Sequence, residues 1–279
     1  MDPERKIVIP EDFFDLFVQE LRADDTEMSR DYYKFAGNAG AGKYMFRKSY
    51  FLSRLEYLYR HIGPKDAAIW DAGCGYGTTG IFLALNGYRV RGTTIGRQYG
   101  ERLPTRLAFW SRHGEVSGFT MAYEDLLEHL PDAPRYDRII VQDTLHHLEP
   151  IGDALHVLRE ALKPEGKIIA IEENGGNLIQ RARLYARRRK RVVEYRDEVL
   201  GKNVCFGDEN IRPFETWRNL FEAAGMGIDD HEYIRLFPPP FWSKNNYARR
   251  REQENRLYKN HHFLRDYLYF GVNFLARRA

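Results

Sequence analysis

The sequence feature that most constrains the fold is the segment Ile69–Gly80, which reads IWDAGCGYGTTG. The apolar residues before it predict a strand, its glycines predict a tight turn, and the apolar spacing after it predicts a helix. Glycine has no Cβ, so the backbone can turn sharply here and approach a ligand closely. Open α/β sheets bind nucleotide-like cofactors where a strand passes through such a turn into a helix. The segment therefore predicts an α/β fold with a cofactor site at the turn.

Apolar runs alternate with helical patterns through most of the chain. Strands are predicted at 67–73, 88–96, 117–123, 136–143, 167–173, 231–237 and 269–278, and helices at 79–87, from 97 to about 113, 152–162 and 215–225. Strands that alternate with helices form a mostly parallel sheet, covered by helices on both faces. We therefore expect an open, layered α/β domain.

Residues 1–62 are predicted to form a helical N-terminal lid, because their apolar side chains recur every three to four positions. The glycine- and alanine-rich stretch Phe35–Lys43 predicts a flexible connector inside this lid. A stripe of apolar residues on the first helix is expected to be exposed and able to pair two copies of the chain. It consists of Phe13, Phe14, Phe17 and Leu21.

The remaining residues, 63–279, are assigned to the main domain, with cap insertions at 174–214 and 238–265. The first insertion is basic and aperiodic, so the sequence predicts no particular secondary structure for it. Its run 181–191 contains most of the local positive charge. Any charged partner surface should therefore be local, since the net charge of the chain is small.

Length and composition exclude several classes of protein. The chain has 279 residues, a formal charge of +3 and 43% hydrophobic side chains, which describes a globular chain with its own core. The N-terminus lacks the basic stretch and apolar run of a secretory signal, and no window approaches about 18 consecutive apolar residues, so we expect a cytoplasmic location. Cys74 and Cys205 have no metal-ligand spacing, so neither a disulfide framework nor a metal site is predicted.

Two classes of cofactor fit the glycine turn. Gly75, Gly77 and Gly80 satisfy the G-x-G-x-x-G pattern of dinucleotide binders. Asp71 favours the other class, because a carboxylate at the strand end repels a pyrophosphate and attracts the ammonium of a methionine moiety. The second strand also ends without the carboxylate that dinucleotide binders use for the ribose. Arg97 keeps open an NADP-dependent alternative.

The segment Asp71–Gly77 resembles motif I of the class I S-adenosylmethionine-dependent methyltransferases. Later landmarks agree in order and spacing, namely YDRIIVQD before LHHL and LKPEG before KIIAIE. This resemblance covers about 60–175 well. It implies a seven-stranded Rossmann-like sheet, S-adenosylmethionine as cofactor and methyl transfer as the reaction.

Within that superfamily, Gly92–Gln98 resembles the cyclopropane fatty acid synthase, mycolic acid methyltransferase and isoprenoid C-methyltransferase branch, which replaces the usual ribose-binding acid with threonine. Tyr123 and Glu124, with Asp125 as an alternative to Glu124, match the branch's adenine-binding segment. The cofactor-binding residues implied by the resemblance are Asp71, Gly73, Gly75, Gly77, Thr94, Ile95, Gln98, Tyr123, Glu124 and Gln142.

Acid–base residues are expected after the fourth and fifth strands, where loops converge over the cofactor. His146 and His147 are the first candidates, because a histidine can accept a proton near neutral pH. His147 is expected to pack inward, and His146 to reach the substrate. Glu173 is a further candidate, although Glu172 and Glu173 could also form a solvated pair. His146 replaces the glutamate of the cyclopropane synthases, so we do not carry over ring formation.

The acceptor should be enclosed by parts outside the shared core, since the fold alone does not determine the substrate. Tyr32, Tyr33 and Trp242 are the predicted substrate-binding residues. Their aromatic character favours a hydrophobic or aromatic small molecule, such as a lipid or natural product. The run 181–191 predicts either a solvated helix face or a site for an anion. If it is a site for an anion, the acceptor can itself be anionic.

Three hypotheses therefore stand. The first is a methyltransferase that acts on carbon or oxygen of a hydrophobic small molecule. The acceptor can be either neutral or anionic under this hypothesis. The second is an NADP-dependent oxidoreductase, and the third is a non-catalytic membrane- or RNA-binding module. A pI of 8.7 with 40 acidic residues disfavours nucleic acid as a partner. Peripheral membrane contact and a homo-oligomer stay open.

Overall fold

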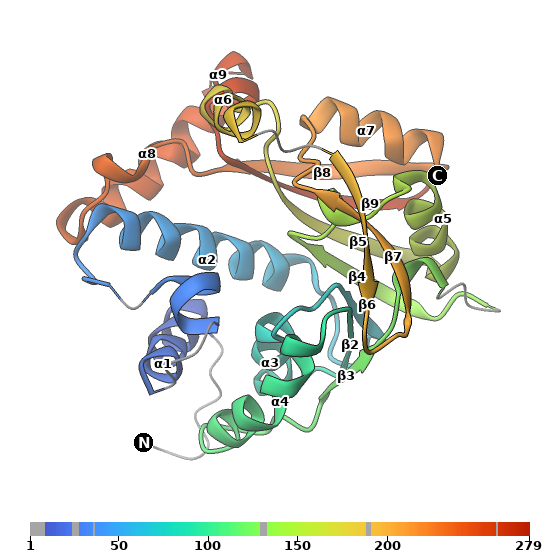
Figure 1. Cartoon of the computed structure of the whole chain (residues 1–279). Helices are drawn as coiled ribbons and strands as arrows, with labels where there is room; N and C mark the ends of the chain where they lie inside the picture. The colour runs from blue at the N-terminus through green and yellow to red at the C-terminus, as the bar shows by residue number, and fades with distance from the viewer. Residues whose placement is uncertain (1–8, 24–27, 36, 129–132, 188–190, 261) are drawn as a thin grey trace.

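A seven-stranded sheet forms the centre of the computed structural model, which describes residues 9–23, 28–35, 37–128, 133–187, 191–260 and 262–279. The strand order is β3-β2-β1-β4-β5-β9-β8 (Figure 1). The strands are β1 (Ile69–Ala72), β2 (Val90–Thr94), β3 (Phe119–Tyr123), β4 (Tyr136–Gln142), β5 (Leu162–Glu173), β8 (Met226–Ile234) and β9 (Gly271–Arg278). β9 runs antiparallel to β5 and β8, and the pairs among β1 to β5 are parallel. The predicted seven-stranded, mostly parallel sheet is confirmed.

The glycine turn lies where the strand order reverses. β1 sits between β2 and β4, so the connections on either side of it leave in opposite directions and open a crevice at the carboxyl ends of the strands. The backbone N–H groups of Gly73 and Cys74 both donate to the Thr93 carbonyl at 2.9 Å, which ties the turn to β2. The topology therefore places the turn at the ligand-binding edge of the sheet.

Helices cover both faces of the sheet because the apolar strand side chains alternate between two cores. On β4, Ile140 packs into one core, and Ile139 and Val141 pack into the other. The first core includes Phe82 of α3, and the second includes Trp217 of α7. The covering helices are α3 (Thr78–Leu85), α4 (Arg97–Trp110), α5 (Ile151–Ala161) and α7 (Phe214–Ala223). Short helical turns occur at Met28–Tyr33, Leu126–Glu128, Leu145–His147, Pro239–Phe241 and Lys244–Asn246.

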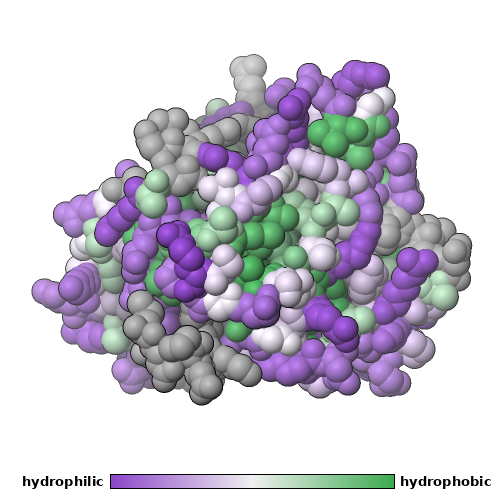
Figure 2. Space-filling view, turned by 90° about the horizontal axis from the view of Figure 1, so that it is seen from below, coloured by the Kyte–Doolittle hydropathy of each residue, from purple (hydrophilic) through white to green (hydrophobic). Residues whose placement is uncertain are grey.

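The N-terminal helices α1 (Pro10–Ala23) and α2 (Gly42–His61) belong to the first core. The predicted exposed stripe on α1 is wrong: the rings of Phe13, Phe14 and Phe17 are fully buried, because Phe13 stacks on Trp110 of α4 and meets Phe82 of α3. From below, the molecule shows hydrophobic residues gathered at the centre of this face and hydrophilic residues around them (Figure 2). Motion of residues 1–62 as a lid stays a prediction.

A buried ion pair fastens α1 to the glycine turn. Glu20 accepts hydrogen bonds from Nε and Nη2 of Arg106, both at 2.8 Å, and from the Trp110 indole at 2.9 Å. Arg106 also donates to the Tyr76 carbonyl and to the Thr78 hydroxyl. Both partners of this pair are almost completely buried. The pair therefore couples the packing of α1 to the shape of the turn.

Removal of Glu20 should destabilise the fold. We expect Glu20→Ala to lower the free energy of unfolding by about 3–5 kcal/mol, because it leaves a buried guanidinium without its counter-charge. Asp15→Ala on the same helix is the matched control, since that carboxylate is 70% exposed and its loss should cost less than about 1 kcal/mol. Urea denaturation followed by circular dichroism measures both values. Equal values for the two variants would contradict the assigned role of the pair.

The two predicted cap insertions, 174–214 and 238–265, contain regular structure. The first, which appeared aperiodic in sequence, forms α6 (Leu178–Ala186) and a hairpin of β6 (Arg191–Asp197) and β7 (Lys202–Asp208). The second contains α8 (Tyr247–Asn260) and the beginning of α9 (His262–Leu268), which continues past the predicted boundary at 265. Of the basic run 181–191, residues 188–190 lie outside the described part. Leu148 pairs with Phe206, and Gly96 donates its N–H to Asp197, so the hairpin lies over the carboxyl end of the sheet.

Candidate active site

Two cavities meet at the carboxyl end of the sheet. The larger has a volume of about 480 Å³ and the smaller about 170 Å³. Four residues line both of them, namely Tyr32, Gly73, Gln142 and Asp143. The cavities are therefore adjacent, and the glycine turn forms part of the boundary between them.

The smaller cavity contains most of the predicted cofactor residues. Of these, it is lined by Gly73, Gly75, Thr94, Ile95, Glu124 and Gln142. Tyr99 and the β7 segment 204–206 also line this cavity, and neither was among the predicted cofactor residues. An ideal Cβ at Gly75 would meet no atom closer than the Tyr32 hydroxyl, 3.7 Å away, so it would occupy cavity space. The turn at Gly75 is thus kept open toward a ligand.

Three predicted cofactor residues and one predicted substrate residue lie outside both cavities, in the described part of the chain. A Cβ at Gly77 would lie 2.5 Å from the Phe119 ring, so this glycine permits helix–sheet packing. Tyr123 donates its hydroxyl to the Arg97 carbonyl at 2.6 Å, and Gln98 follows Arg97 on α4. Trp242 is buried and donates to the Phe237 carbonyl at 2.6 Å. These positions favour supporting roles for the four residues.

Asp71 and Arg54 face the larger cavity with incompletely satisfied polar atoms. Asp71 is 2% exposed, and its Oδ2 has no hydrogen-bond partner among the described residues. Burial raises the pKa of Asp71 to about 7. The Arg54 Nε is likewise buried without a partner in the described structure, although its Nη1 pairs with Asp143. A carboxylate and a guanidinium beside the turn fit the ammonium and carboxylate of a methionine moiety.

His146 and Glu172 form a buried pair at the wall of the larger cavity. The His146 Nδ1 lies 2.5 Å from Glu172 Oε2, and Glu172 is fully buried. Glu172 Oε1 also accepts the N–H groups of Thr144 at 3.1 Å and Leu145 at 2.7 Å, which fixes the carboxylate. Burial lowers the pKa of His146, but attraction to Glu172 outweighs it and raises that pKa to about 9. The suggestion of a solvated Glu172–Glu173 pair is wrong for Glu172, because β5 points it into the protein.

His147 has a different environment. Its Nδ1 lies 2.8 Å from the Gly207 carbonyl and therefore donates to it, and its ring stacks on Phe206 of the hairpin. Burial, with a smaller contribution from His146, lowers the pKa of His147 to about 4. His147 lines the smaller cavity and His146 the larger one. The structure thus separates the two neighbouring histidines, and the more buried of them is His146 rather than His147.

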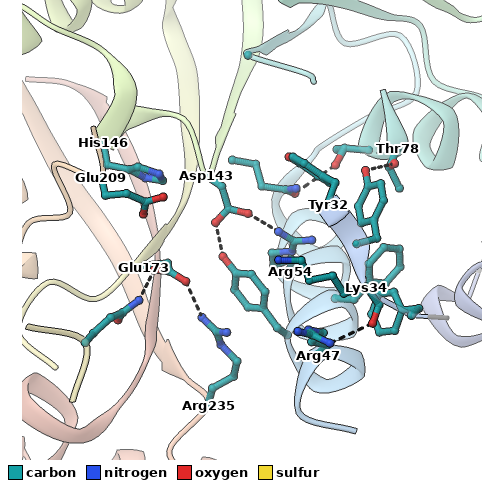
Figure 3. Close-up of a pocket in the computed structure, with 18 of the residues that line it drawn as sticks. Tyr32, Lys34, Arg47, Arg54, Thr78, Asp143, His146, Glu173, Glu209 and Arg235 are labelled. Atoms are coloured by element: carbon teal, nitrogen blue, oxygen red, sulfur yellow. Dashed lines mark hydrogen bonds and ion pairs between the residues drawn. The ribbon is translucent and has the colours of Figure 1, made fainter. Parts of the chain in front are cut away.

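One face of α2 forms a wall of the larger cavity, and sequence analysis missed it. Arg47, Tyr50 and Arg54 recur at helical spacing and all line the cavity. Tyr50 and Arg54 both contact the carboxylate of Asp143, which has a left-handed φ of 50° and turns away from the end of β4 (Figure 3). The spacing of Arg47, Tyr50 and Arg54 by three and four residues was the available signal. Their partner Asp143 could not be found that way, because it is distant in sequence.

Glu173 and Arg235 form the opposite side of the cavity (Figure 3). Burial raises the pKa of Glu173 to about 6, although Arg235 opposes this. Gln180 of α6 donates to Glu173 Oε2. Tyr32 and Tyr33 line the same cavity, and the hydroxyl groups of Tyr33 and Thr78 share a hydrogen bond of 2.5 Å. Three of the predicted residues, Glu173, Tyr32 and Tyr33, therefore meet around one cavity with His146.

The comparisons with known proteins agree with this geometry. A family model described as a methyltransferase domain matches residues 70–168, which include the glycine turn and His146. This chain is an S-adenosylmethionine-dependent methyltransferase. The methyltransferase is 28% identical over 192 residues to a ubiquinone biosynthesis O-methyltransferase of Xylella fastidiosa, covering 66% of this chain and 71% of that protein. S-Adenosylmethionine is the cofactor of this chain.

Solved structures show the same fold. The magnesium protoporphyrin IX methyltransferase of Synechocystis matches the methyltransferase with a TM-score of 0.56 at 14% identity, over 98% of both chains. The 1,6-didemethyltoxoflavin-N1-methyltransferase of Burkholderia thailandensis matches with a TM-score of 0.51 at 15% identity, over 99% of this chain and 93% of that one. Among the described helices of the methyltransferase, none is both long and apolar enough to cross a membrane.

Proposed function

We propose that the enzyme transfers a methyl group to oxygen or carbon of a hydrophobic, anionic small molecule, with His146 as the residue that accepts the proton of the acceptor. The observation that carries this proposal is the buried His146–Glu172 pair, which lines the same cavity as Asp71 and Gly73 of the glycine turn. An acid–base group and the cofactor turn thus face one shared space. Acceptors with a hydroxyl group or an acidic carbon require such a group.

The cofactor would be held by the turn and by the charged residues beside it. Asp71 would bind its ammonium group and Arg54 its carboxylate, while Thr94, Ile95 and Glu124 would line the nucleoside part. When bound, the cofactor supplies a methyl group on a cationic sulfur. The protein then has to orient the acceptor and accept its proton, and orientation alone accounts for about 7–11 kcal/mol of the barrier in well-aligned reactions.

The raised pKa of His146 suits this role. A phenol has a pKa of about 10, so transfer of its proton to an ordinary histidine of pKa about 6.5 costs roughly 5 kcal/mol. With the pKa of His146 near 9, the same transfer costs about 1.4 kcal/mol. Glu172 causes this reduction in the cost of proton transfer, because its carboxylate stabilises the imidazolium that forms. The Nε2 atom is the ring nitrogen left to face the acceptor.

The lining of the larger cavity supports a hydrophobic acceptor with negative charge. Aromatic rings are contributed by Tyr32, Tyr33, Phe35, Tyr50 and Phe51, and cationic groups by Lys34, Arg47, Arg54, Arg183, Arg187 and Arg235. The carboxylates that line it are fewer, namely Asp71, Asp143, Glu173 and Glu209. Rings with an excess of positive charge favour an apolar body that carries an anionic group.

The relatives and the sequence resemblance favour a small-molecule acceptor. Relatives from Xylella fastidiosa and Alkalilimnicola ehrlichii are named as ubiquinone biosynthesis O-methyltransferases, which makes oxygen the preferred acceptor atom here. The resemblance of Gly92–Gln98 to the isoprenoid C-methyltransferase branch keeps carbon as the alternative. A cytoplasmic location remains part of the proposal.

Isothermal titration tests the proposal against its two alternatives. We expect S-adenosylhomocysteine to bind in the micromolar range, and NADPH and phosphatidylglycerol vesicles to give no saturable heat. Incubation with methyl-labelled S-adenosylmethionine and an organic-acid extract should then place the label on oxygen or carbon of a product, as its NMR shift reveals. Binding of NADPH without S-adenosylhomocysteine, or label on nitrogen alone, would contradict the proposal.

A further inference from the structure

Arg235 is a buried cation with an unused hydrogen-bonding edge. Its side chain is 7% exposed and lines the larger cavity, yet Nε and Nη2 have no hydrogen-bond partner among the described residues. Its nearest counter-charge is Glu173 Oε1, 3.8 Å from Nη2, which is too far for a hydrogen bond. Buried N–H groups are almost always paired in native proteins, so this edge calls for a missing partner.

The protein already contains a pattern for that partner. Arg106 presents the same two atoms, Nε and Nη2, to the two carboxylate oxygens of Glu20 at 2.8 Å each. A side-on pair of this kind matches the spacing of one carboxylate. The unpaired Nε and Nη2 atoms of Arg235 could therefore bind one carboxylate in the same way, and that carboxylate would belong to a ligand in the cavity.

The surroundings of Arg235 hold its guanidinium in place. Arg235 follows β8 with a left-handed φ of 61°, and its guanidinium carbon lies 3.6 Å from the centre of the Tyr50 ring and 5.0 Å from that of Phe46. These stacking contacts fix the plane of the guanidinium, while Nε and Nη2 lie buried without a hydrogen-bond partner in the described structure. In Figure 3, the Arg235 guanidinium points toward Glu173. The group is thus positioned before any ligand arrives.

We propose that Arg235 binds a carboxylate of the acceptor through Nε and Nη2, so that the substrates are carboxylic acids with a hydrophobic body. This inference rests on the proposed function and narrows its substrate class. Arg235, Glu173 and His146 all line the larger cavity. An acceptor anchored on Arg235 would therefore present another part of its body to His146. Asp143 does not compete for Arg235, because Tyr50 and Arg54 already bind it.

The test measures binding of benzoate, benzamide and phenyl phosphate by ligand-observed NMR, with the enzyme saturated with S-adenosylhomocysteine. We expect benzoate to bind the wild type at least about tenfold more tightly than benzamide, which has the same shape without the charge. Arg235→Gln should weaken benzoate binding about tenfold or more and leave benzamide unchanged. Arg235→Lys, which keeps the charge but loses the planar edge, should fall between the two.

Arg249→Gln is the matched control, because it removes the same charge from an exposed position on α8 that lines neither cavity. It should change benzoate affinity less than about twofold. Thermal melts of each variant check folding, and the wild-type comparison of benzoate with benzamide needs no variant. Equal binding of those two, no benzoate binding, unchanged benzoate binding by Arg235→Gln, or tighter binding of phenyl phosphate would each overturn the carboxylate assignment. Failure of S-adenosylhomocysteine to bind would instead contradict the proposed function.

Discussion

Replacement of His146 by glutamine is expected to lower kcat for methyl transfer by about 10²- to 10⁴-fold, the contribution typical of a positioned general base. Glutamine keeps a hydrogen-bonding side chain of similar size but cannot take up the proton. The affinity for S-adenosylhomocysteine should stay within about twofold, because His146 lines the larger cavity and not the nucleoside cavity. Turnover assays and titration calorimetry on the same protein give the two values.

The matched control for this variant is His156→Gln, since His156 is an exposed residue on α5. It should retain full turnover. The same outcome for His146→Gln would reduce His146 to a structural residue. A parallel loss of turnover and cofactor affinity would also contradict the assignment, because it would indicate a distorted site.

The pH dependence of turnover provides an independent check on His146. Its pKa is raised to about 9, and a base must be neutral to accept a proton, so kcat/KM should rise with pH, with a midpoint near pH 9, and level off above it. Glu172→Gln removes the main cause of the raised pKa and should move the midpoint toward the ordinary value of about 6.5. It should also lower kcat, because the imidazolium loses its counter-charge. A profile that is flat or falls between pH 7 and pH 9 would be inconsistent with His146 as the base.

Gly75→Val is expected to weaken binding of S-adenosylhomocysteine by about 100-fold or more while the protein stays folded. Gly75 has a φ of 51°, and the space beside its Cα is cavity rather than protein, so a valine side chain would fill part of the cofactor site. A 100-fold loss of affinity corresponds to about 3 kcal/mol of binding free energy. Titration calorimetry measures the affinity, and circular dichroism checks the fold.

Gly87→Val separates ligand exclusion from backbone strain. Gly87 also has a positive φ, 81°, and a Cβ there meets no atom within 4 Å. Both variants should therefore lose similar stability, about 1–3 kcal/mol, from the strained conformation. The affinity of Gly87→Val for S-adenosylhomocysteine should remain that of the wild type. Similar affinities for the two variants would mean that the cofactor does not contact the turn at Gly75.

The sheet, the glycine turn and the position of the cofactor site follow from sequence alone. Each depends on residues that are adjacent in the chain: apolar runs that make strands, and glycines that permit positive φ at Gly73 and Gly75. Gly77 and Tyr123 also lie in the predicted elements. Their packing roles depend on neighbours such as Phe119, so their spacing in sequence could not separate them from ligand-binding residues.

The His146–Glu172 pair and the walls of the larger cavity were decided only by tertiary structure. Glu172 meets His146 because β4 and β5 are paired and end together, and Arg235 reaches the same cavity from β8, far along the chain. Burial then sets the chemistry: it raises the pKa of Asp71 and leaves one edge of Arg235 unpaired. Burial and distant contacts are properties of the folded chain, and local sequence patterns carry no record of them.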